Sequence, residues 1–141
     1  MKQKLSYYLY RGIKFLVRLL YPKIKVIGLE NIPEEPALYI GNHSQMNGPI
    51  ACELYFPVKR RTWCASQMMT LKEVPAYAFQ DFWSEKPVWI RWFFKLLSYV
   101  IAPISVCVFN NAETVPVYHD MRIRATFKET IEHLENGTSM V

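Results

Sequence analysis

Cysteine is scarce in this sequence, and its spacing excludes a cysteine-ligated metal site. The 141 residues contain three cysteines, Cys52, Cys64 and Cys107, and none has a metal-ligand spacing to another. Three is also an odd number, so disulfides within the chain could not use them all. We interpret them as reduced, mostly buried thiols in a cytosolic setting, and we predict neither a metal nor a cofactor.

Several short motifs of known chemistry are also absent. The sequence has no Gly-rich phosphate loop and no nucleophile elbow, so it gives no support for a nucleotide-phosphate cradle or a serine hydrolase. It has no internal repeat, and 51% of its residues are hydrophobic, which is typical of one folded domain. No secretory signal is evident, because Arg11, Lys14 and Arg18 interrupt the first apolar segment.

Acidic residues are missing from the first 25 positions, which carry seven Lys or Arg. The other 116 residues hold ten basic and twelve acidic side chains, so the net charge of +5 belongs to the N-terminus. Residues 4–21 are predicted to form an amphipathic helix with leucines on one face. The opposite face carries four cations, which are the predicted membrane-binding residues: Lys4, Arg11, Lys14 and Arg18.

This pattern favours a helix that lies in a membrane surface, with tyrosines at the boundary of its two faces. The alternative is a helix packed on the domain with its basic face in water. A full membrane span is less expected, because charges recur every turn or two.

The stretch ALYIGNHSQMNGP at positions 37–49 is the second informative segment. Its first part, 37–41, is a short apolar run that predicts a buried strand, and Pro49 suits the first turn of a helix. His43 would then lie at the carboxyl end of a strand, where open α/β sheets place their ligand sites. Imidazole titrates near neutral pH, so His43 is the strongest candidate for proton transfer; the alternative is a turn residue without a catalytic role.

The remaining pattern predicts an α/β fold: a mixed, mainly parallel sheet with helices on both faces, preceded by the N-terminal amphipathic helix. Strands are expected at 23–28, 62–65 and 115–118, and again from Thr138. Helices are expected near 49–56, 68–82 with an interruption at Pro75, 88–101 ahead of a break at Pro103, and 121–136 with Asp120 as N-cap.

Two of these segments have open interpretations. The helix from 88 to 101 is expected to be partly buried and partly interfacial, the alternative being a wholly buried core helix. The basic loop at 59–61 could meet phosphate or only solvent. The apolar run that starts at Thr138 and stops at Val141 suggests a missing C-terminal part. We therefore divide the chain into a membrane-docking helix, 1–22, and an incomplete α/β domain, 23–141.

Taken together, these residues resemble the glycerolipid acyltransferase family of the lysophosphatidate acyltransferase type. GLENIPEEPALYIGNHS at 28–44 looks like the lead-in to the family signature, which is Asn-His, four residues, Asp. VPVYHDMRIRATFKETIEHLENG at 115–137 looks like the second block, and the cationic N-terminal helix resembles the membrane-docking element. The resemblance runs from about residue 21 to 141, and the chain ends before the family's third block, Phe-Pro-Glu-Gly.

The sequence departs from the family pattern at two further places. Gly48 stands where the family has the Asp of its signature, and Asn47 is the nearest polar residue. His119 stands where many members have an arginine in the second block. The resemblance therefore implies the fold more strongly than a complete catalytic site.

The resemblance implies that His43 acts as general base on a hydroxyl group, which then attacks the thioester of acyl-CoA or acyl-carrier protein. In the family, the Asp orients the imidazole and stabilises its charged form, and Asn47 and Asp120 are the candidate substitutes here. If the strands before His43 and His119 are parallel neighbours, both residues lie in one polar cleft. The expected substrate-binding residues are Asn42, Ser44, His119 and Arg122.

The predicted function is therefore acyl transfer to a lysophospholipid or glycerol-phosphate hydroxyl in phospholipid biosynthesis. The expected partners are membrane lipid and an acyl thioester donor, and the expected location is the cytoplasmic face of a membrane, peripheral or monotopic. A catalytically impaired lipid-binding pseudoenzyme or fragment of the same fold is the alternative, favoured by Gly48. Nucleic acid is not an expected partner, because the positive charge is confined to one leucine-rich helix.

Overall fold

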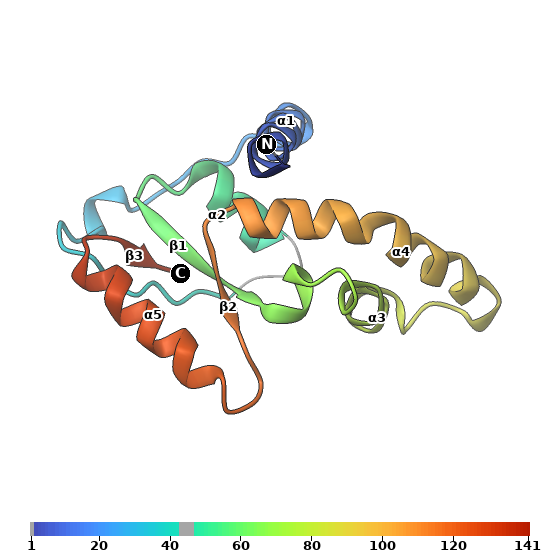
Figure 1. Ribbon diagram of the computed structural model, residues 1–141. Helices are drawn as coiled ribbons and strands as arrows, with labels where there is room; N and C mark the ends of the chain where they lie inside the picture. The colour runs from blue at the N-terminus through green and yellow to red at the C-terminus, as the bar shows by residue number, and fades with distance from the viewer. Residues whose placement is uncertain (1, 43–46) are drawn as a thin grey trace.

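Three short parallel strands form the sheet in the computed structural model, which describes residues 2–42 and 47–141 (Figure 1). The central strand is β1 (Arg60–Ala65), with β2 (Thr114–Val117) on one side and β3 (Ser139–Met140) on the other. The strands predicted at 62–65, at 115–118 and after Thr138 are therefore confirmed. The chain is a mixed α/β protein with a small parallel sheet and a helix at its N-terminus.

The strand expected at 37–41 is reduced to a partial edge strand. Leu38 forms one parallel bridge with Met140 of β3, and the amide of Tyr39 donates to the carbonyl of Met140 at 2.8 Å. The run is also not buried, since Leu38 is 46% and Ile40 90% exposed. A strand at a sheet edge is buried only where other elements cover it, and these two side chains are left open. Residues 23–28 form no strand.

Helical segments make up most of the rest of the described chain. Their bounds are α1 Lys2–Leu20, η1 Leu29–Asn31, α2 Asn47–Tyr55, η2 Ser66–Met69, α3 Val74–Ala78, η3 Phe79–Trp83, α4 Val88–Asn111 and α5 Ile123–Glu135. The predicted helix at 49–56 corresponds to α2. The helical interruption expected at Pro75 lies instead between Met69 and Val74. Pro75 is in the first turn of α3, where its missing N–H is not needed.

The predicted end of a helix before Pro103 is wrong, because α4 continues through this residue to Asn111. A proline inside a helix costs about 3 kcal/mol. Packing against α3 offsets this cost: Ala102 is buried against Val74 and Ala78, in the main apolar core cluster of the described residues. A local rule that ends helices at proline misses a contact made with residues almost thirty positions away.

α5 does not bury its most apolar side chains. Phe127 and Ile131, four residues apart on one face of the helix, are 50% and 56% exposed, whereas Thr126 and Thr130 are buried. The Thr126 hydroxyl donates to the carbonyl of Pro116 in β2 at 2.7 Å. The indole N–H of Trp63 donates to the Thr130 hydroxyl at 2.9 Å, so hydrogen bonds attach this helix to the sheet.

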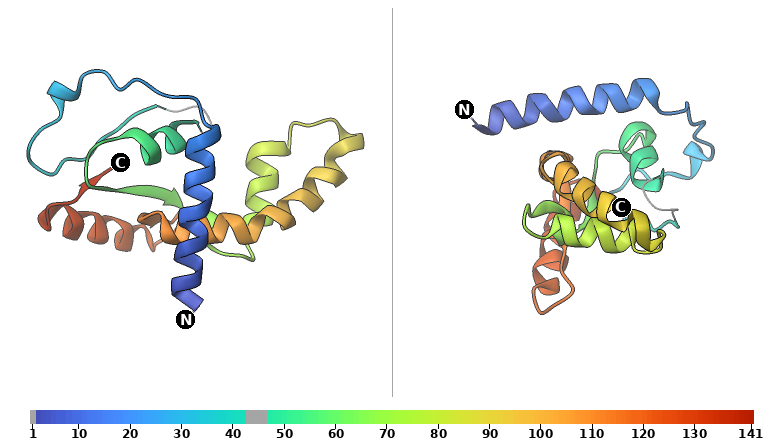
Figure 2. Two further views of the ribbon diagram at one scale, coloured as in Figure 1. Left: turned by 90° about the horizontal axis from the view of Figure 1, so that it is seen from above. Right: turned by 90° about the vertical axis from the view of Figure 1, so that its right-hand side faces the viewer.

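The two long helices cross near the C-terminal end of α4 (Figure 2). The N-terminal half of α4 extends beyond α1 together with α3, as the view from above shows. α5 lies on the opposite side of the molecule from α1, which is visible in Figure 1 and in the right-hand view of Figure 2.

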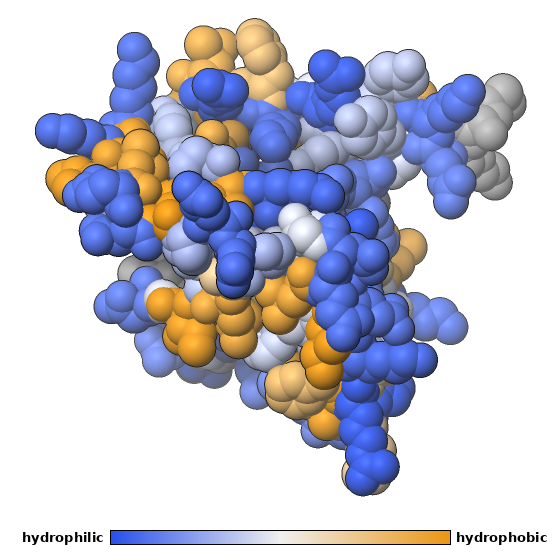
Figure 3. Space-filling model, turned by 90° about the vertical axis from the view of Figure 1, so that its left-hand side faces the viewer, coloured by the Kyte–Doolittle hydropathy of each residue, from blue (hydrophilic) through white to orange (hydrophobic). Residues whose placement is uncertain are grey.

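Burial is limited for a chain of this size. The accessible surface is 10544 Å², whereas a compact monomer of 16.6 kDa is expected to expose about 7,600 Å². Figure 3 shows one side of the molecule, on which apolar residues are exposed in several groups separated by hydrophilic ones. Much apolar surface is therefore left without a covering element, which is typical of proteins that contact a further partner or a membrane.

Candidate functional site

Two of the predicted site residues, His43 and Ser44, lie outside the described residues. Asn42 and Asn47, on either side of them, are both exposed. Asn47 begins α2, where its side-chain oxygen and its carbonyl oxygen lie 3.4 and 3.3 Å from the Tyr21 hydroxyl, which can donate to either. The Asn47 side chain is thus near α1 and the start of the linker that follows it.

The strand order separates the two regions that were expected to form one cleft. The segment before His43 pairs with β3, and the residue His119 follows β2. All pairs are parallel, so both segments end at the same edge of the sheet, as predicted. However, β3 and β1 lie between them, a separation of about 14 Å at the usual 4.8 Å per strand. The expectation of neighbouring strands is therefore wrong.

Asp120 and Arg122 bind each other. Their side chains form an ion pair at 2.7 Å, and the Arg122 guanidinium stacks on the Tyr118 ring at 4.4 Å. Asp120 also accepts the Arg122 amide at 2.8 Å, in the turn before α5, so it is not the N-cap of that helix. Hydrogen bonds from Arg122 hold the pKa of Asp120 below its ordinary value. The carboxylate is thereby oriented toward a guanidinium at an exposed site.

His119 lines a polar cleft beside the carboxyl ends of β1 and β2. The other lining residues are Gln67, Tyr77, Gln80, Asp81, Phe82, Ser84 and Glu85. Asp81 and Glu85 are the only charged side chains among them, and Arg122 is not part of the lining. Burial, and then the carboxylate of Asp81, raises the pKa of Tyr77. A phosphate placed here would meet two carboxylates and neither a lysine nor an arginine, so the cleft suits a neutral or cationic group better.

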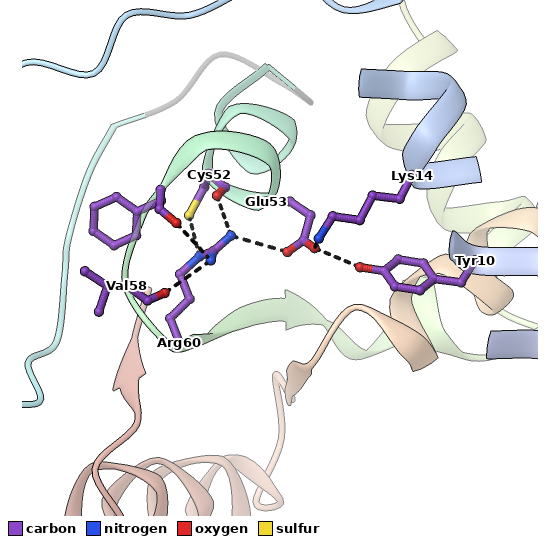
Figure 4. A network of polar contacts seen from close by, with 7 residues as sticks. Tyr10, Lys14, Cys52, Glu53, Val58 and Arg60 are labelled. Atoms are coloured by element: carbon purple, nitrogen blue, oxygen red, sulfur yellow. Dashed lines mark hydrogen bonds and ion pairs between the residues drawn. The ribbon is translucent and has the colours of Figure 1, made fainter. Parts of the chain in front are cut away.

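A polar network attaches α1 to the rest of the chain (Figure 4). Glu53 of α2 accepts the Tyr10 hydroxyl at 2.7 Å, forms an ion pair with Lys14, and lies 3.3 Å from Arg60 of β1. Burial, followed by the bond to Glu53, raises the pKa of Tyr10. Lys14, predicted to bind membranes, is therefore committed to a partner within the chain.

Arg60 is likewise occupied. It belongs to β1 rather than to a basic loop, and its guanidinium donates to the carbonyl oxygens of Cys52, Phe56 and Val58. Its Nε lies 3.1 Å from the Cys52 sulfur. The side chain is only 11% exposed, so it is not available to a phosphate group. Sequence reasoning missed Glu53 as the centre of this network; the signal was a single charge in the otherwise apolar or neutral segment of α2.

The outer side of α1 retains the other predicted features. Lys4, Arg11 and Arg18 are exposed. The leucine face is also open, with Leu5, Leu9, Leu16, Leu19 and Leu20 between 55% and 82% exposed. An exposed cationic face combined with an exposed leucine face is the arrangement expected of a helix at a membrane interface.

An apolar cavity of about 120 Å³ lies beneath α1. Its apolar walls include Ile13, Val17, Ile50, Leu54, Val108 and Phe109. Lys14 and Glu53 also line it. Pockets for drug-sized ligands measure about 300–1,000 Å³, so this cavity is too small for a complete acyl chain.

α4 presents a second apolar surface. Among the described residues it is the one helix that is long and apolar enough to cross a membrane, by length and composition alone. Its apolar side chains are largely exposed: Val88, Trp89, Trp92, Phe93, Leu96, Tyr99, Val100 and Ile104.

Comparisons with models of protein families, with curated proteins and with solved structures gave no match. The likeness to glycerolipid acyltransferases consequently depends on the sequence motifs at 28–44 and 115–137.

Proposed function

We propose that this protein works at a membrane surface as an acyltransferase, moving a fatty acyl group from a thioester donor to a hydroxyl of a lysophospholipid or glycerol phosphate. The observation that supports membrane binding is that α1 exposes its leucine face together with the cations Lys4, Arg11 and Arg18. The chemical part comes from the motif around His43. The proposed location is the cytoplasmic face, peripheral or monotopic.

We also propose that the sheet is mainly parallel and is covered by helices on both of its faces. In support, every strand pairing is parallel, α5 packs on β2 and β3, and α4 contacts β2. A histidine that follows a parallel strand emerges at the carboxyl edge, where such sheets bind ligands.

In the proposed reaction, His43 takes the proton of the acceptor hydroxyl, whose oxygen attacks the thioester carbonyl. The carbon–sulfur bond then breaks, and the departing thiolate of CoA or of the carrier protein takes the proton from the imidazolium. Asn47 is a better candidate than Asp120 for orienting the imidazole. Asp120 is held by Arg122 and follows a strand two positions removed from β3. An amide can orient an imidazole but adds no charge, and loss of an orienting carboxylate can cost about 10⁴ in rate.

The chemistry is tested with radiolabelled palmitoyl-CoA or palmitoyl-acyl-carrier protein and lysophosphatidate on vesicles. We expect slow acyl transfer that His43→Ala abolishes and Gly48→Asp increases at least tenfold, since the latter restores the carboxylate of the family signature. Asp120→Asn is the matched control and should leave the rate within about twofold. Transfer that survives His43→Ala would rule out the proposed base.

Membrane binding is tested separately by flotation with vesicles of phosphatidylcholine and phosphatidylglycerol. Replacing Lys4, Arg11 and Arg18 by Gln should weaken binding by about 3 kcal/mol before screening by salt, at about 1 kcal/mol for each cation. Lys14→Gln is the control, and should weaken it less because Lys14 already has a partner. Equal flotation of the triple variant and the parent would contradict the assignment of this face.

A second candidate is a lipid-binding protein of the same fold without turnover. Gly48 at the signature position and the Asp120–Arg122 pair favour it. Vesicle binding by the parent, together with no acyl transfer by the parent or by Gly48→Asp, would select this candidate.

A further inference from the structure

The exposed apolar residues of α4 form one continuous stripe along the helix. Trp89, Phe93, Leu96, Val100 and Ile104 follow one another at intervals of three or four residues, which places them on one face. They are between 46% and 75% exposed. We call these five residues, with Trp92 and Tyr99 beside them, the α4 stripe.

The α4 stripe continues beneath α1. Cys107 is the next position on the same face after Ile104, and its sulfur lies 3.6 Å from the Ser6 hydroxyl of α1. Asn111, one turn further, donates its side-chain N–H to the same hydroxyl at 2.9 Å. α1 therefore covers only the C-terminal end of this face and leaves the α4 stripe open.

The opposite face of α4 is attached to the protein. Ala102 and Ser98 are buried, and the Ser105 hydroxyl donates to the carbonyl of Met68 at 3.3 Å. A helix that crossed a membrane would have to give up these contacts and those with Val74 and Ala78 in α3. The geometry thus allows one face of α4 to meet lipid while the other face remains on the protein.

We propose that the α4 stripe lies flat in the lipid interface and forms a second membrane contact beside α1. This inference rests on the membrane-surface function proposed above and adds to it the surface that enters the bilayer. Trp89, Trp92 and Tyr99 have the amphipathic rings that concentrate at the level of lipid headgroups. Arg91 and Lys95 are the only charged residues of α4.

Charge complementarity identifies the occupant as an anionic membrane rather than a second protein. α1 and α4 contain no acidic residue, and Lys4, Arg11 and Arg18 of α1 are exposed, so all the charges on these two helices are positive. Anionic headgroups complement that charge, and their acyl chains accept the α4 stripe. The surface left open beyond that of a compact monomer, about 3,000 Å², is large enough for both helices to contribute.

The test compares two single substitutions at equally exposed apolar positions. Leu96 in the α4 stripe is 59% exposed, and Ile131 of α5, on the opposite side of the molecule, is 56% exposed. Leu96→Asp should reduce affinity for vesicles of phosphatidylcholine and phosphatidylglycerol at least tenfold, and Ile131→Asp should change it less than twofold. Both variants should fold, because each position is exposed.

Tryptophan fluorescence locates the contact. Vesicles with brominated acyl chains should quench the parent, and the combined Trp89→Phe and Trp92→Phe variant should lose most of that quenching, while Trp63→Phe should retain it. A carbonate wash should release the protein from the vesicles.

The outcomes separate this inference from the function on which it rests. If the parent floats but Leu96→Asp and Ile131→Asp lose equal affinity, the role of the α4 stripe is overturned and docking by α1 stands. The same conclusion follows if the parent floats but shows no quenching through Trp89 and Trp92. Resistance to the carbonate wash would overturn the flat orientation in favour of a span. Failure of the parent to float would overturn both.

Discussion

α1 and α4 are both long helices with exposed apolar faces, but they are held on the protein in different ways. α4 is attached by apolar packing, with Ala102 buried against Val74 and Ala78. α1 is attached by polar contacts, in which Tyr10 and Lys14 meet the single carboxylate of Glu53. The cavity of about 120 Å³ under α1 indicates that its apolar packing is incomplete.

This difference in attachment indicates which of the two helices separates more easily from the domain. Apolar packing depends little on salt or pH. The ion pair between Lys14 and Glu53, whose side chains are 39% and 29% exposed, weakens when salt is added and when the pH neutralises one partner. A detached α1 would also lose the tertiary packing from which most of the stability of a protein helix comes. We therefore expect α4 to be part of the cooperative fold and α1 to separate from it first.

The largest effect is expected from breaking the attachment of α4. Ala102 is 2% exposed, so Ala102→Asp buries an unpaired charge and should lower the free energy of unfolding by at least about 3 kcal/mol. Urea unfolding followed by circular dichroism measures this. Ile104→Asp, two residues along at a position that is 49% exposed, is the control and should cost less than about 1 kcal/mol. Similar losses for both would mean that α4 is not held by this packing.

A smaller and more local effect is expected from the attachment of α1. Glu53→Gln keeps the shape of the side chain but removes the charge that Lys14 and Arg60 meet, and should cost about 1–2 kcal/mol. Amide hydrogen exchange should become faster in α1 and remain unchanged in α4. Glu132→Gln removes only an exposed pair with Lys128 and should alter neither helix. Equal acceleration in α4 would show that the two helices unfold together.

How far the sequence predicts this fold depends on whether the decisive contact is local. The periodicity of the first twenty residues and the apolar run before Ala65 identified α1 and β1 correctly. α4 continues beyond Pro103 because its residue Ala102 packs against Val74. Thr126 is buried because its hydroxyl bonds to the carbonyl of Pro116 in β2. No local pattern contains either partner.

The candidate site shows the same limit. The motif around His43 and the parallel direction of the strands could be predicted, but strand order could not, and it separates β2 from the segment before His43. The same limit applies to Lys14, which was predicted to face a membrane and which the structure pairs with Glu53. Its partner Glu53 is 39 residues away, and a cation pattern on one helix does not reveal a carboxylate on another.

The smallest effect is expected from alkaline pH, and it sharpens the comparison because it acts on one attachment alone. The pKa of Tyr10 is raised in the docked state, first by burial and then by Glu53, above the ordinary value of 10.0 that applies when α1 is released. Docking is therefore at full strength below pH 10 and weakens as pH rises above it, because release lets the phenol ionise.

Between pH 9 and 10.5 this linkage amounts to somewhat less than about 1 kcal/mol. Tyr10→Phe removes it, so the parent should lose about that much more stability than the variant over this range, as measured by urea unfolding at both pH values. Burial also raises the pKa of Cys64, to about 12, which destabilises the folded state above pH 9. That contribution is common to both proteins and cancels in their difference. A parent and variant with parallel pH dependence would show that Tyr10 does not hold α1 through Glu53.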